Sequence, residues 1–336
     1  MHTCGDPMNF GATILGVDGV RLTKDEFTFF RDADPFGFIL FSRNIDTPDQ
    51  VYGLCSELRD AVGRNAIITI DQEGGRVQRL GAPHWQEWLP PLDFIQSAGD
   101  NAERAMYLRY RLIAYELTQL TIDSNCAPML DVLVAATHDF LRNRCYGSSP
   151  YDISILGRAA ANGMLDGGVV PVIKHLPGHG RAALDSHFAL PHVDVSIEIL
   201  READFVPFRA LADLPMGMTA HVVYEAVDEE PATLSSEIMH LIREDIGFDG
   251  LIMTDDIGMK ALTGGASQIV TRALGAGCDV ILHCNASLSE RIETATAAGK
   301  MNSKSQARAE AARASGSFLN NIDNTELRAE LESLLA

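Results

Sequence analysis

A fourteen-residue stretch, KHLPGHGRAALDSH, concentrates side chains that could do chemistry between positions 174 and 187. It contains three histidines together with a lysine, an arginine, an aspartate and a serine. Glycine and proline recur too often for a regular helix or strand, so the stretch is predicted to be a loop. Such a loop could cage a metal, cradle a phosphate, transfer protons, or serve only as a polar turn.

The metal and phosphate interpretations are the weaker ones. The histidines, Asp185 and the nearby His192 could ligate zinc, but their spacing matches no common zinc pattern. A phosphate cradle needs a glycine-rich turn that leads straight into a helix, and no clear helix follows Gly178 and Gly180. The sequence therefore predicts neither a metal nor another cofactor.

Proton transfer is the favoured interpretation of the loop. Asp185 and His187 are two residues apart, close enough for a hydrogen bond within a turn. A carboxylate fixes the tautomer of its histidine and stabilises the imidazolium. An ordinary polar turn beside a surface histidine remains the alternative, although the company of Lys174 and His175 counts against it.

A second chemical motif is GLIMTDDIGMKAL at 250–262, where two carboxylates directly follow an apolar run. Adjacent side chains leave the backbone in different directions, so only one of the two carboxylates can point along the axis of a barrel. Asp255 is the better candidate because it directly follows the predicted strand. It could be a nucleophile, a general base or a metal ligand. Alternatively the pair caps a following helix, and Asp256 could do so while Asp255 reacts.

A third motif, TIDQEGGRVQRL at 69–80, combines Asp71 with Arg76 and Arg79. A carboxylate beside an arginine offers sugar hydroxyls both acceptors and donors in fixed geometry. The same residues could also form an unremarkable surface ion pair. Farther along, FLRNRCYGSSP adds Arg142 and Arg144.

The elements that must position these residues follow a repeating rhythm of short apolar runs and helical patterns. The apolar runs, read as strands, are 12–17, 37–41, 66–70, 126–132, 170–175, 216–221, 251–254 and 279–284. The clearest helical patterns are 47–62, 101–122, 196–212, 235–245 and 266–276. Eight strands alternating with helices predict a (β/α)8 TIM barrel, with an open doubly wound sheet as the alternative.

Polar residues close all eight of the predicted strands. They are Asp18, Ser42-Arg43-Asn44, Asp71, Asp131, Lys174-His175, His221, Asp255-Asp256 and Cys284-Asn285. Because active sites of such barrels lie where the strands end, a polar pocket is expected at this face.

Length and composition predict one globular domain over residues 1–336. The barrel should cover about 12–300 and a helical tail about 301–336, with a break at 320–324. The formal net charge of −19 argues against nucleic acid or an anionic membrane as a partner.

The remaining features favour a cytoplasmic location. The six cysteines form no CxxC pair and are predicted to be reduced and mostly buried. The first residues lack a basic segment followed by an apolar one, and no apolar run reaches the ~18 residues of a transmembrane helix.

Taken together, these motifs resemble the family 3 glycoside hydrolases, and more narrowly the bacterial single-domain β-N-acetylglucosaminidases of peptidoglycan recycling. The resemblance spans about residues 14 to 285. It rests on FILFSRNI, IDQEGGRVQRL, NRCYG, KHLPGHG with DSH, MTAHVVY, DEEPATLS and GFDGLIMTDDIGMKAL.

The resemblance implies a TIM barrel and a retaining exo-hydrolase that releases terminal N-acetylglucosamine from muropeptide fragments. It assigns Asp255 as the nucleophile and Asp185 with His187 as the acid/base pair. The positions that match sugar-binding residues of the family are Asp71, Arg79, Arg144, Lys174 and His175.

Three other functions stay open at this stage. A β-glucosidase or a phosphorolytic relative would use the same family framework. A metal-dependent hydrolase would use the histidines as ligands, and a non-catalytic sugar-binding barrel would use DSH only as scaffold.

Overall fold

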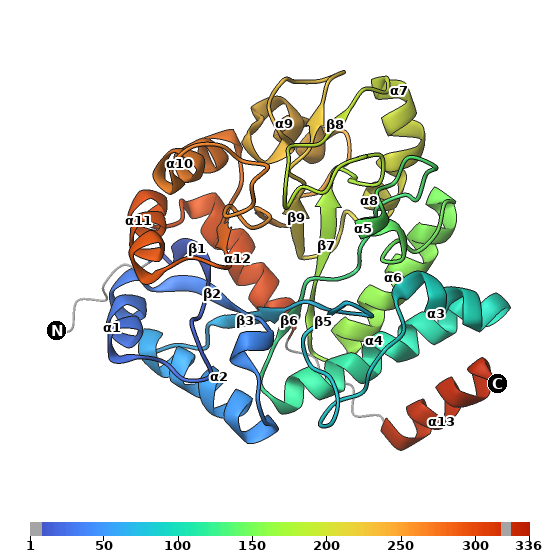
Figure 1. The fold of residues 1–336 in the computed structure, drawn as a ribbon, viewed down its shortest axis with the longest axis horizontal. Coiled ribbons are helices and arrows are strands. Elements are labelled where there is room, and N and C mark those ends of the chain that lie inside the picture. Colours follow the sequence, from blue (N-terminus) through green and yellow to red (C-terminus); the bar gives the residue numbers. More distant parts are fainter. Residues whose placement is uncertain (1–8, 317–323) are drawn as a thin grey trace.

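The apolar runs form one parallel sheet that closes into a barrel (Figure 1). The computed structural model describes residues 9–316 and 324–336. Within these residues the barrel strands are β1 (Gly11–Gly16), β2 (Pro35–Leu40), β3 (Ile67–Ile70), β6 (Ser124–Asn125), β7 (Val170–Leu176), β9 (Met216–Thr219), β11 (Leu251–Met253) and β12 (Ile281–His283).

The strand order shows the closure. Neighbours run β11-β9-β7-β6-β3-β2-β1-β12, and every pairing between them is parallel. A parallel bridge between Met253 and Val280 joins the two ends of this order. The predicted TIM barrel is therefore confirmed, and the open doubly wound sheet is excluded because such a sheet keeps two free edges.

Helices surround the strands (Figure 1). They are α1 (Lys24–Ala33), α2 (Pro48–Val62), α3 (Pro91–Ala98), α4 (Ala102–Gln119), α5 (Asp139–Arg142), α6 (Pro150–Asp166), α7 (Ile197–Ile199), α8 (Val206–Ala210), α9 (Ser236–Glu244), α10 (Ala266–Ala276), α11 (Leu288–Ala298), α12 (Ser303–Ser315) and α13 (Asn324–Leu335). Short elements in the loops are β4 (Gln72–Gly74), β5 (Val77–Gln78), β8 (His192–Val193), β10 (Val223–Tyr224) and single helical turns at Ser42–Asn44, Gly99–Asn101, Leu200–Asp204 and Ala232–Leu234.

Local sequence explains where these helices begin. The Thr47 side chain accepts a hydrogen bond from Gln50 N, and Pro48 occupies the first helical turn of α2, so the helix predicted at 47–62 begins at Pro48. The predicted helix at 196–212 is instead divided into α7, a π-helical turn at Leu200–Asp204, and α8. Pro207 lies at the start of α8, where its missing N–H costs no helical hydrogen bond.

The fourth strand differs most from its prediction. β6 ends at Asn125, whereas the apolar run suggested a strand at 126–132. That run still lies beside β7, since Val172 N donates to Ala127 O and Met129 bridges Lys174. Pro128 has no N–H for a continuous ladder, which explains why the regular strand ends early.

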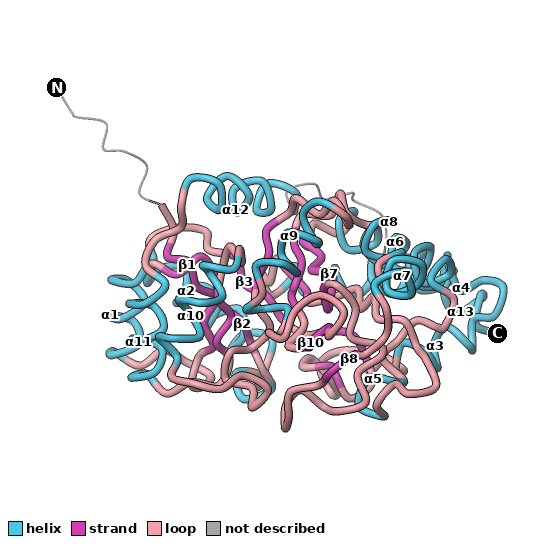
Figure 2. Tube along the Cα trace, turned by 90° about the horizontal axis from the view of Figure 1, so that it is seen from above, coloured by secondary structure: helices cyan, strands magenta, loops and turns pink. Residues whose placement is uncertain are grey.

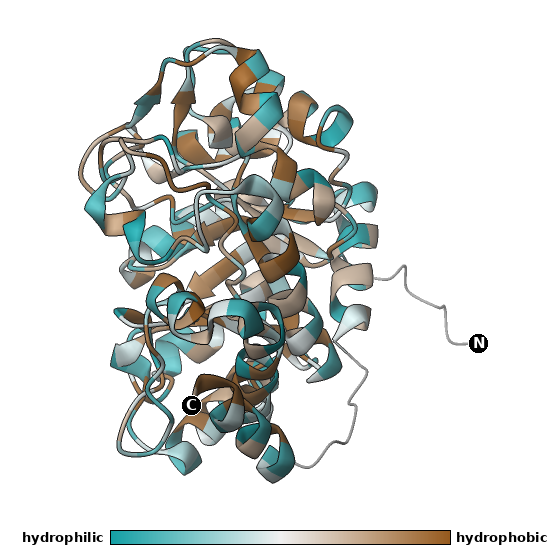
Figure 3. Cartoon of the chain, turned by 90° about the vertical axis from the view of Figure 1, so that its right-hand side faces the viewer, coloured by the Kyte–Doolittle hydropathy of each residue, from teal (hydrophilic) through white to brown (hydrophobic). Residues whose placement is uncertain are grey.

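The core lies inside the barrel and between the barrel and its helices. All residues of the eight barrel strands are buried, as expected of strands covered on both faces. In Figure 3 the central strands are brown, whereas the surrounding helices carry both brown and teal sides.

The C-terminal segment is helical within the described residues. α12 covers the face of the barrel opposite β8 and β10, where the Arg308 and Ser305 side chains both donate to Asp279 (Figure 2). α13 packs on α4 and α3. The predicted break at 320–324 falls almost wholly on residues 317–323, which lie outside the described part of the chain.

Candidate active site

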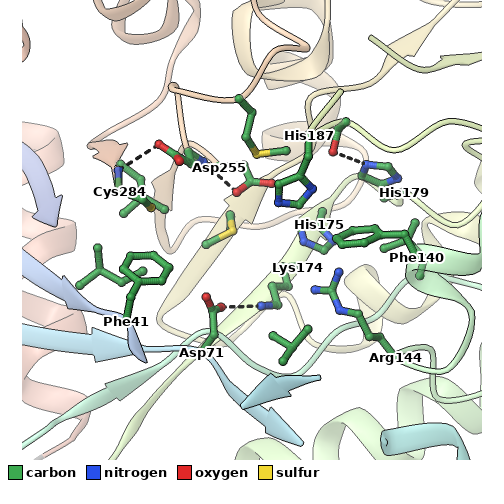
Figure 4. Close-up of a pocket in the computed structure, with 18 of the residues that line it drawn as sticks. Phe41, Asp71, Phe140, Arg144, Lys174, His175, His179, His187, Asp255 and Cys284 are labelled. Atoms are coloured by element: carbon green, nitrogen blue, oxygen red, sulfur yellow. Dashed lines mark hydrogen bonds and ion pairs between the residues drawn. The ribbon is translucent and has the colours of Figure 1, made fainter. Parts of the chain in front are cut away.

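A pocket of about 240 Å³ opens at the C-terminal ends of the barrel strands, the face where the sequence predicts it. Its lining comes from the loops after several strands (Figure 4). The polar lining residues are Asp71, Arg76, Arg79, Arg144, Lys174, His175, His179, Ser186, His187, Asp255, Asp256 and Asn285.

A network of buried charges forms one side of the pocket. Asp71 accepts hydrogen bonds from Arg79 at 2.9 Å and from Lys174 at 3.0 Å. Glu73 binds the Arg144 guanidinium through both carboxylate oxygens, at 2.8 and 2.9 Å, and its Oε1 lies 2.6 Å from Lys174 Nζ. Each cation is thus held by a carboxylate in fixed geometry.

The same contacts keep these groups ionised. Burial alone would raise the pKa of Glu73, but Arg144 and Lys174 outweigh it and lower that pKa to about 2. Lys174 and Arg79 likewise hold the pKa of Asp71 well below its ordinary range, against the effect of burial. The pocket therefore offers fixed positive and negative groups at neutral pH.

His175 is held by a carboxylate behind the pocket. Its Nδ1 lies 2.7 Å from Asp131 Oδ2, and Asp131 Oδ1 accepts the backbone N–H of His179 at 2.6 Å. Burial would raise the pKa of Asp131, yet His175 and the hydrogen bonds lower it to about 2. An ionised partner at Nδ1 orients the imidazole so that Nε2 faces the pocket.

The two aspartates after β11 have different surroundings. Asp256 is buried, and its Oδ1 accepts the N–H groups of Cys284 at 2.9 Å and Gly258 at 3.1 Å. The proposed helix cap is wrong, because the next helix begins only at Ala266 and has Gly265 as its N-cap. Asp256 instead ties the loop after β11 to the end of β12.

Asp255 is the carboxylate left accessible in the pocket. Its Oδ1 accepts only the adjacent Asp256 N–H, at 2.8 Å, among the hydrogen bonds of the described residues. Burial would raise its pKa, but the fields of His221 and His175 outweigh burial and the pKa is lowered. His221 itself lies behind the pocket, where its Nε2 donates to Asp256 O at 3.0 Å. Asp255 is thus an ionised, available carboxylate.

Asp185 and His187 form the hydrogen bond expected from their spacing. His187 Nδ1 lies 2.8 Å from Asp185 Oδ1, which also accepts the His187 backbone N–H at 3.0 Å. The His187 side chain is 50% exposed, and its ring lies at the pocket near Asp255 and Phe140 (Figure 4). With Nδ1 occupied, Nε2 is the nitrogen that could exchange a proton with a bound molecule.

The first half of the loop is anchored to the scaffold. Tyr224 Oη donates to Gly178 O at 2.7 Å, and Thr137 Oγ1 donates to Gly180 O at 2.6 Å. His179 Nε2 lies 3.3 Å from Ser186 Oγ, which connects the anchored half to the segment that carries His187.

Every residue that the sequence predicts for catalysis or sugar binding lies at this pocket or directly behind it, with Asp185 behind His187. By contrast, His192 and Arg142, which the motifs also offered, lie elsewhere: His192 pairs with Glu225 in an exposed position, and Arg142 pairs with the exposed Asp139. Residues 9–316 and 324–336 contain no group of three His, Cys, Asp or Glu side chains arranged to hold a metal ion.

Glu73 is the functional residue that the sequence reasoning missed. A usable signal was present, because Asp71 and Glu73 are two residues apart in an extended segment, where alternate side chains share one face. Asp131 was noted only as a strand end, and its contact with His175 could not be read from residues 44 positions apart.

Residues 18–314 match the family described as glycosyl hydrolase family 3 N terminal domain. This chain belongs to glycosyl hydrolase family 3. The family resemblance drawn from the sequence motifs is thereby confirmed, and the chain is a glycoside hydrolase.

Proteins with related names are similar to this chain in sequence, and two solved structures share its fold. Two curated proteins named beta-hexosaminidase are 37% identical over 83% of this chain in Alkalilimnicola ehrlichii and 36% identical over 82% in Pseudomonas aeruginosa, each covering 82% of the relative. The crystal structure of NagZ from Neisseria gonorrhoeae in complex with N-trifluoroacetyl-D-glucosamine aligns with a TM-score of 0.80 and 28% identity, over 98% of this chain and 99% of that one. A family 3 β-N-acetylglucosaminidase from a Paenibacillus species aligns with a TM-score of 0.84 and 29% identity, over 96% of this chain and 67% of that one.

Two further predictions concern the cysteines and membrane-spanning helices. Cys55, Cys126, Cys145, Cys278 and Cys284 are free and buried, as predicted, and Cys4 lies outside the described residues. No helix among the described residues is long and apolar enough to cross a membrane.

Proposed function

We propose that this protein is an exo-acting β-N-acetylglucosaminidase that cleaves a terminal, non-reducing N-acetylglucosamine with retention of configuration. The observation that carries the proposal is the meeting of Asp255 and the Asp185–His187 pair at one pocket lined by fixed charges. Family membership and relatives named beta-hexosaminidase support it.

In this proposal Asp255 is the nucleophile. Its lowered pKa keeps it as a carboxylate at neutral pH, which attack on an anomeric carbon requires. Attack would form a covalent glycosyl-enzyme while the bond to the leaving oxygen breaks. Water would then displace Asp255 from the sugar, so that two inversions leave the configuration unchanged.

His187 would supply and recover the proton. Its Nε2 would protonate the leaving oxygen in the first step and take a proton from water in the second. Asp185 Oδ1 at Nδ1 would stabilise the imidazolium between these steps. In this proposal His187 does the work that a second carboxylate does in most glycoside hydrolases. Its place on the loop that faces Asp255 is consistent with that work.

The fixed charges would hold the sugar. Asp71 and the cations around it offer both acceptors and donors, which suits hydroxyl and amide groups. The residues proposed for sugar binding are Asp71, Arg79, Arg144, Lys174 and His175. Binding energy at these groups would orient the anomeric carbon toward Asp255.

We further propose that the natural substrates are N-acetylglucosamine-anhydromuramyl muropeptides handled in the cytoplasm. The free, buried cysteines are consistent with a reducing compartment. Cleavage of purified muropeptides, followed by chromatography of the released sugar, tests the substrate class.

Trapping with a 5-fluoro N-acetylglucosaminyl fluoride tests the reaction class and the nucleophile together. We expect a covalent label on the peptide 250–262, at Asp255, and no label in Asp255→Ala. Asp255→Ala should lower turnover of an aryl N-acetylglucosaminide by at least about 10⁴-fold, and His187→Ala by about 10²- to 10⁴-fold. Wild-type turnover in both variants would overturn the assignment.

Two further assays separate the rival family activities. Aryl β-glucosides should be turned over far more slowly than the N-acetylglucosaminide. Added phosphate should leave N-acetylglucosamine, and not its 1-phosphate, as the product.

A further inference from the structure

Phe140 lies against the histidine that the proposed function uses for proton transfer. Its ring centroid is 4.8 Å from that of His187, and the ring planes meet at 69°. This edge-to-face geometry is the favoured arrangement of two aromatic rings. Phe140 lies on α5, in the loop after β6, whereas His187 lies in the loop after β7, so the contact joins two separate loops (Figure 4).

Asp185 alone does not fix the His187 ring. Its hydrogen bond restrains Nδ1, but Asp185 lies in the same loop as His187, so the bond does not tie the ring to another part of the scaffold. The His187 side chain is half exposed, so little else restrains it. An aromatic ring from another loop restrains the imidazole further, and Phe140 supplies one.

Phe140 is itself held in place by contacts with other residues. The Arg76 guanidinium carbon lies 4.3 Å from the centre of the Phe140 ring, and Arg76 donates to Phe140 O. Arg144, which is locked by Glu73, lies 5.1 Å from the same ring. Leu141 and Met129 belong to the small apolar cluster against which Phe140 packs. The ring is therefore a fixed wall and not a loose rim residue.

We propose that Phe140 is a positioning residue that sets the orientation of the His187 imidazole for proton transfer. This inference rests on the proposed function of His187 as acid/base. Phe140 lines the pocket beside Arg144, so a role in sugar binding would affect every substrate alike, whereas the proposed role affects only the steps in which His187 moves a proton.

Leaving-group dependence tests this role. A dinitrophenyl glycoside departs without a proton, whereas a phenyl glycoside needs one. In Phe140→Leu we expect kcat/KM for the phenyl N-acetylglucosaminide to fall about tenfold, in line with loss of an aromatic pair. For the dinitrophenyl substrate kcat/KM should change less than about twofold, and the Ki of N-acetylglucosamine should stay the same.

Matched variants separate positioning from general damage. Phe140→Tyr keeps the ring and should retain the wild-type ratio between the two substrates. Tyr151→Leu removes an aromatic ring that is 72% exposed on α6, outside the pocket, and should change neither substrate. In a His187→Ala background, Phe140→Leu should cause no further loss, because the group it positions is gone.

Two outcomes would overturn the inference. One is an equal loss for both substrates in Phe140→Leu, and the other is an additive loss in the His187→Ala background. The proposed function fails separately if His187→Ala itself does not discriminate between the two leaving groups. If His187→Ala discriminates and Phe140→Leu does not, only the role of Phe140 is wrong.

Discussion

Single buried carboxylates hold the cationic and imidazole groups of this pocket in place. Asp131 anchors His175, Glu73 anchors Arg144, and Asp71 anchors Arg79. The pairs Asp131–His175 and Glu73–Arg144 also tie the ends of two strands together, whereas Asp71 and Arg79 lie in one loop. Removal of one member leaves the other buried without its counter-charge, which is costly.

Asp131→Asn tests one of these pairs. The amide keeps the shape but removes the charge that orients His175, so we expect kcat/KM to fall about tenfold or more. Steady-state kinetics on an aryl N-acetylglucosaminide measures the effect. Asp139→Asn is the control, because the Asp139 side chain is 96% exposed, and unchanged kinetics in both variants would contradict the role given to Asp131.

At the scale of elements, close contact between two loops determines the shape of the pocket. Gly180, in the loop after β7, approaches the segment that follows β6. A Cβ at Gly180 would overlap the carbonyl oxygen of Val132 and lie 2.8 Å from its carbonyl carbon. The glycine is therefore required by lack of space rather than by its backbone angles. The same loop has Gly178 at a φ of 135°, where glycine is required for conformational reasons.

Gly180→Ala should push these two loops apart. We expect a loss of stability of about 2 kcal/mol, as for other overpacked sites, and a fall in kcat/KM because His187 follows in the same loop. Thermal denaturation and steady-state kinetics measure the two effects.

Gly275→Ala provides the matched control. This glycine lies in α10 with nothing within 4 Å of an added Cβ, so we expect a gain of about 0.5–1 kcal/mol with no kinetic change. An equal effect of the two substitutions would contradict the steric argument.

For the whole molecule, the buried charge network makes stability depend on pH. Burial would raise the pKa of Glu73, but its cationic partners lower it from 4.5 to about 2, and Asp131 falls from 3.8 to about 2. The folded state therefore binds fewer protons than the unfolded chain in this range. The stabilising contribution of these two carboxylates is complete above their ordinary pKa values and is lost as the pH falls toward about 2.

We also propose that the chain unfolds as one unit, since α12 and α13 pack on the barrel and its helices.

Acid melting curves test this dependence. The wild-type Tm should fall between about pH 5 and about pH 3, where the unfolded carboxylates take up protons first. Glu73→Gln should cost about 3 kcal/mol at pH 7 and should show a shallower fall in Tm on acidification, because one titrating group is gone. A variant that loses Tm with the same slope as the wild type would contradict this account. Glu230→Gln, in an exposed pair with Arg272, is the control.

Some of this architecture was predictable because its cause is local. Runs of buried apolar residues, the Thr47-Pro48 helix start, and polar residues at strand ends all follow from short-range periodicity and capping. The spacing of Asp185 and His187 was enough to predict their hydrogen bond, since both lie in one turn. The helix cap assigned to Asp256 failed because the loop after β11 makes its hydrogen bonds with β12 instead.

The sequence by itself determined the alternation of strands and helices, the face on which the pocket opens, and the family to which the motifs point. Only the tertiary structure decided which charges pair and which aromatic ring contacts His187. Glu73 meets Arg144 across 71 residues, and Phe140 meets His187 from another loop. The physical reason is that periodicity and capping act over a few residues, whereas these contacts exist only after barrel closure brings distant strand ends together.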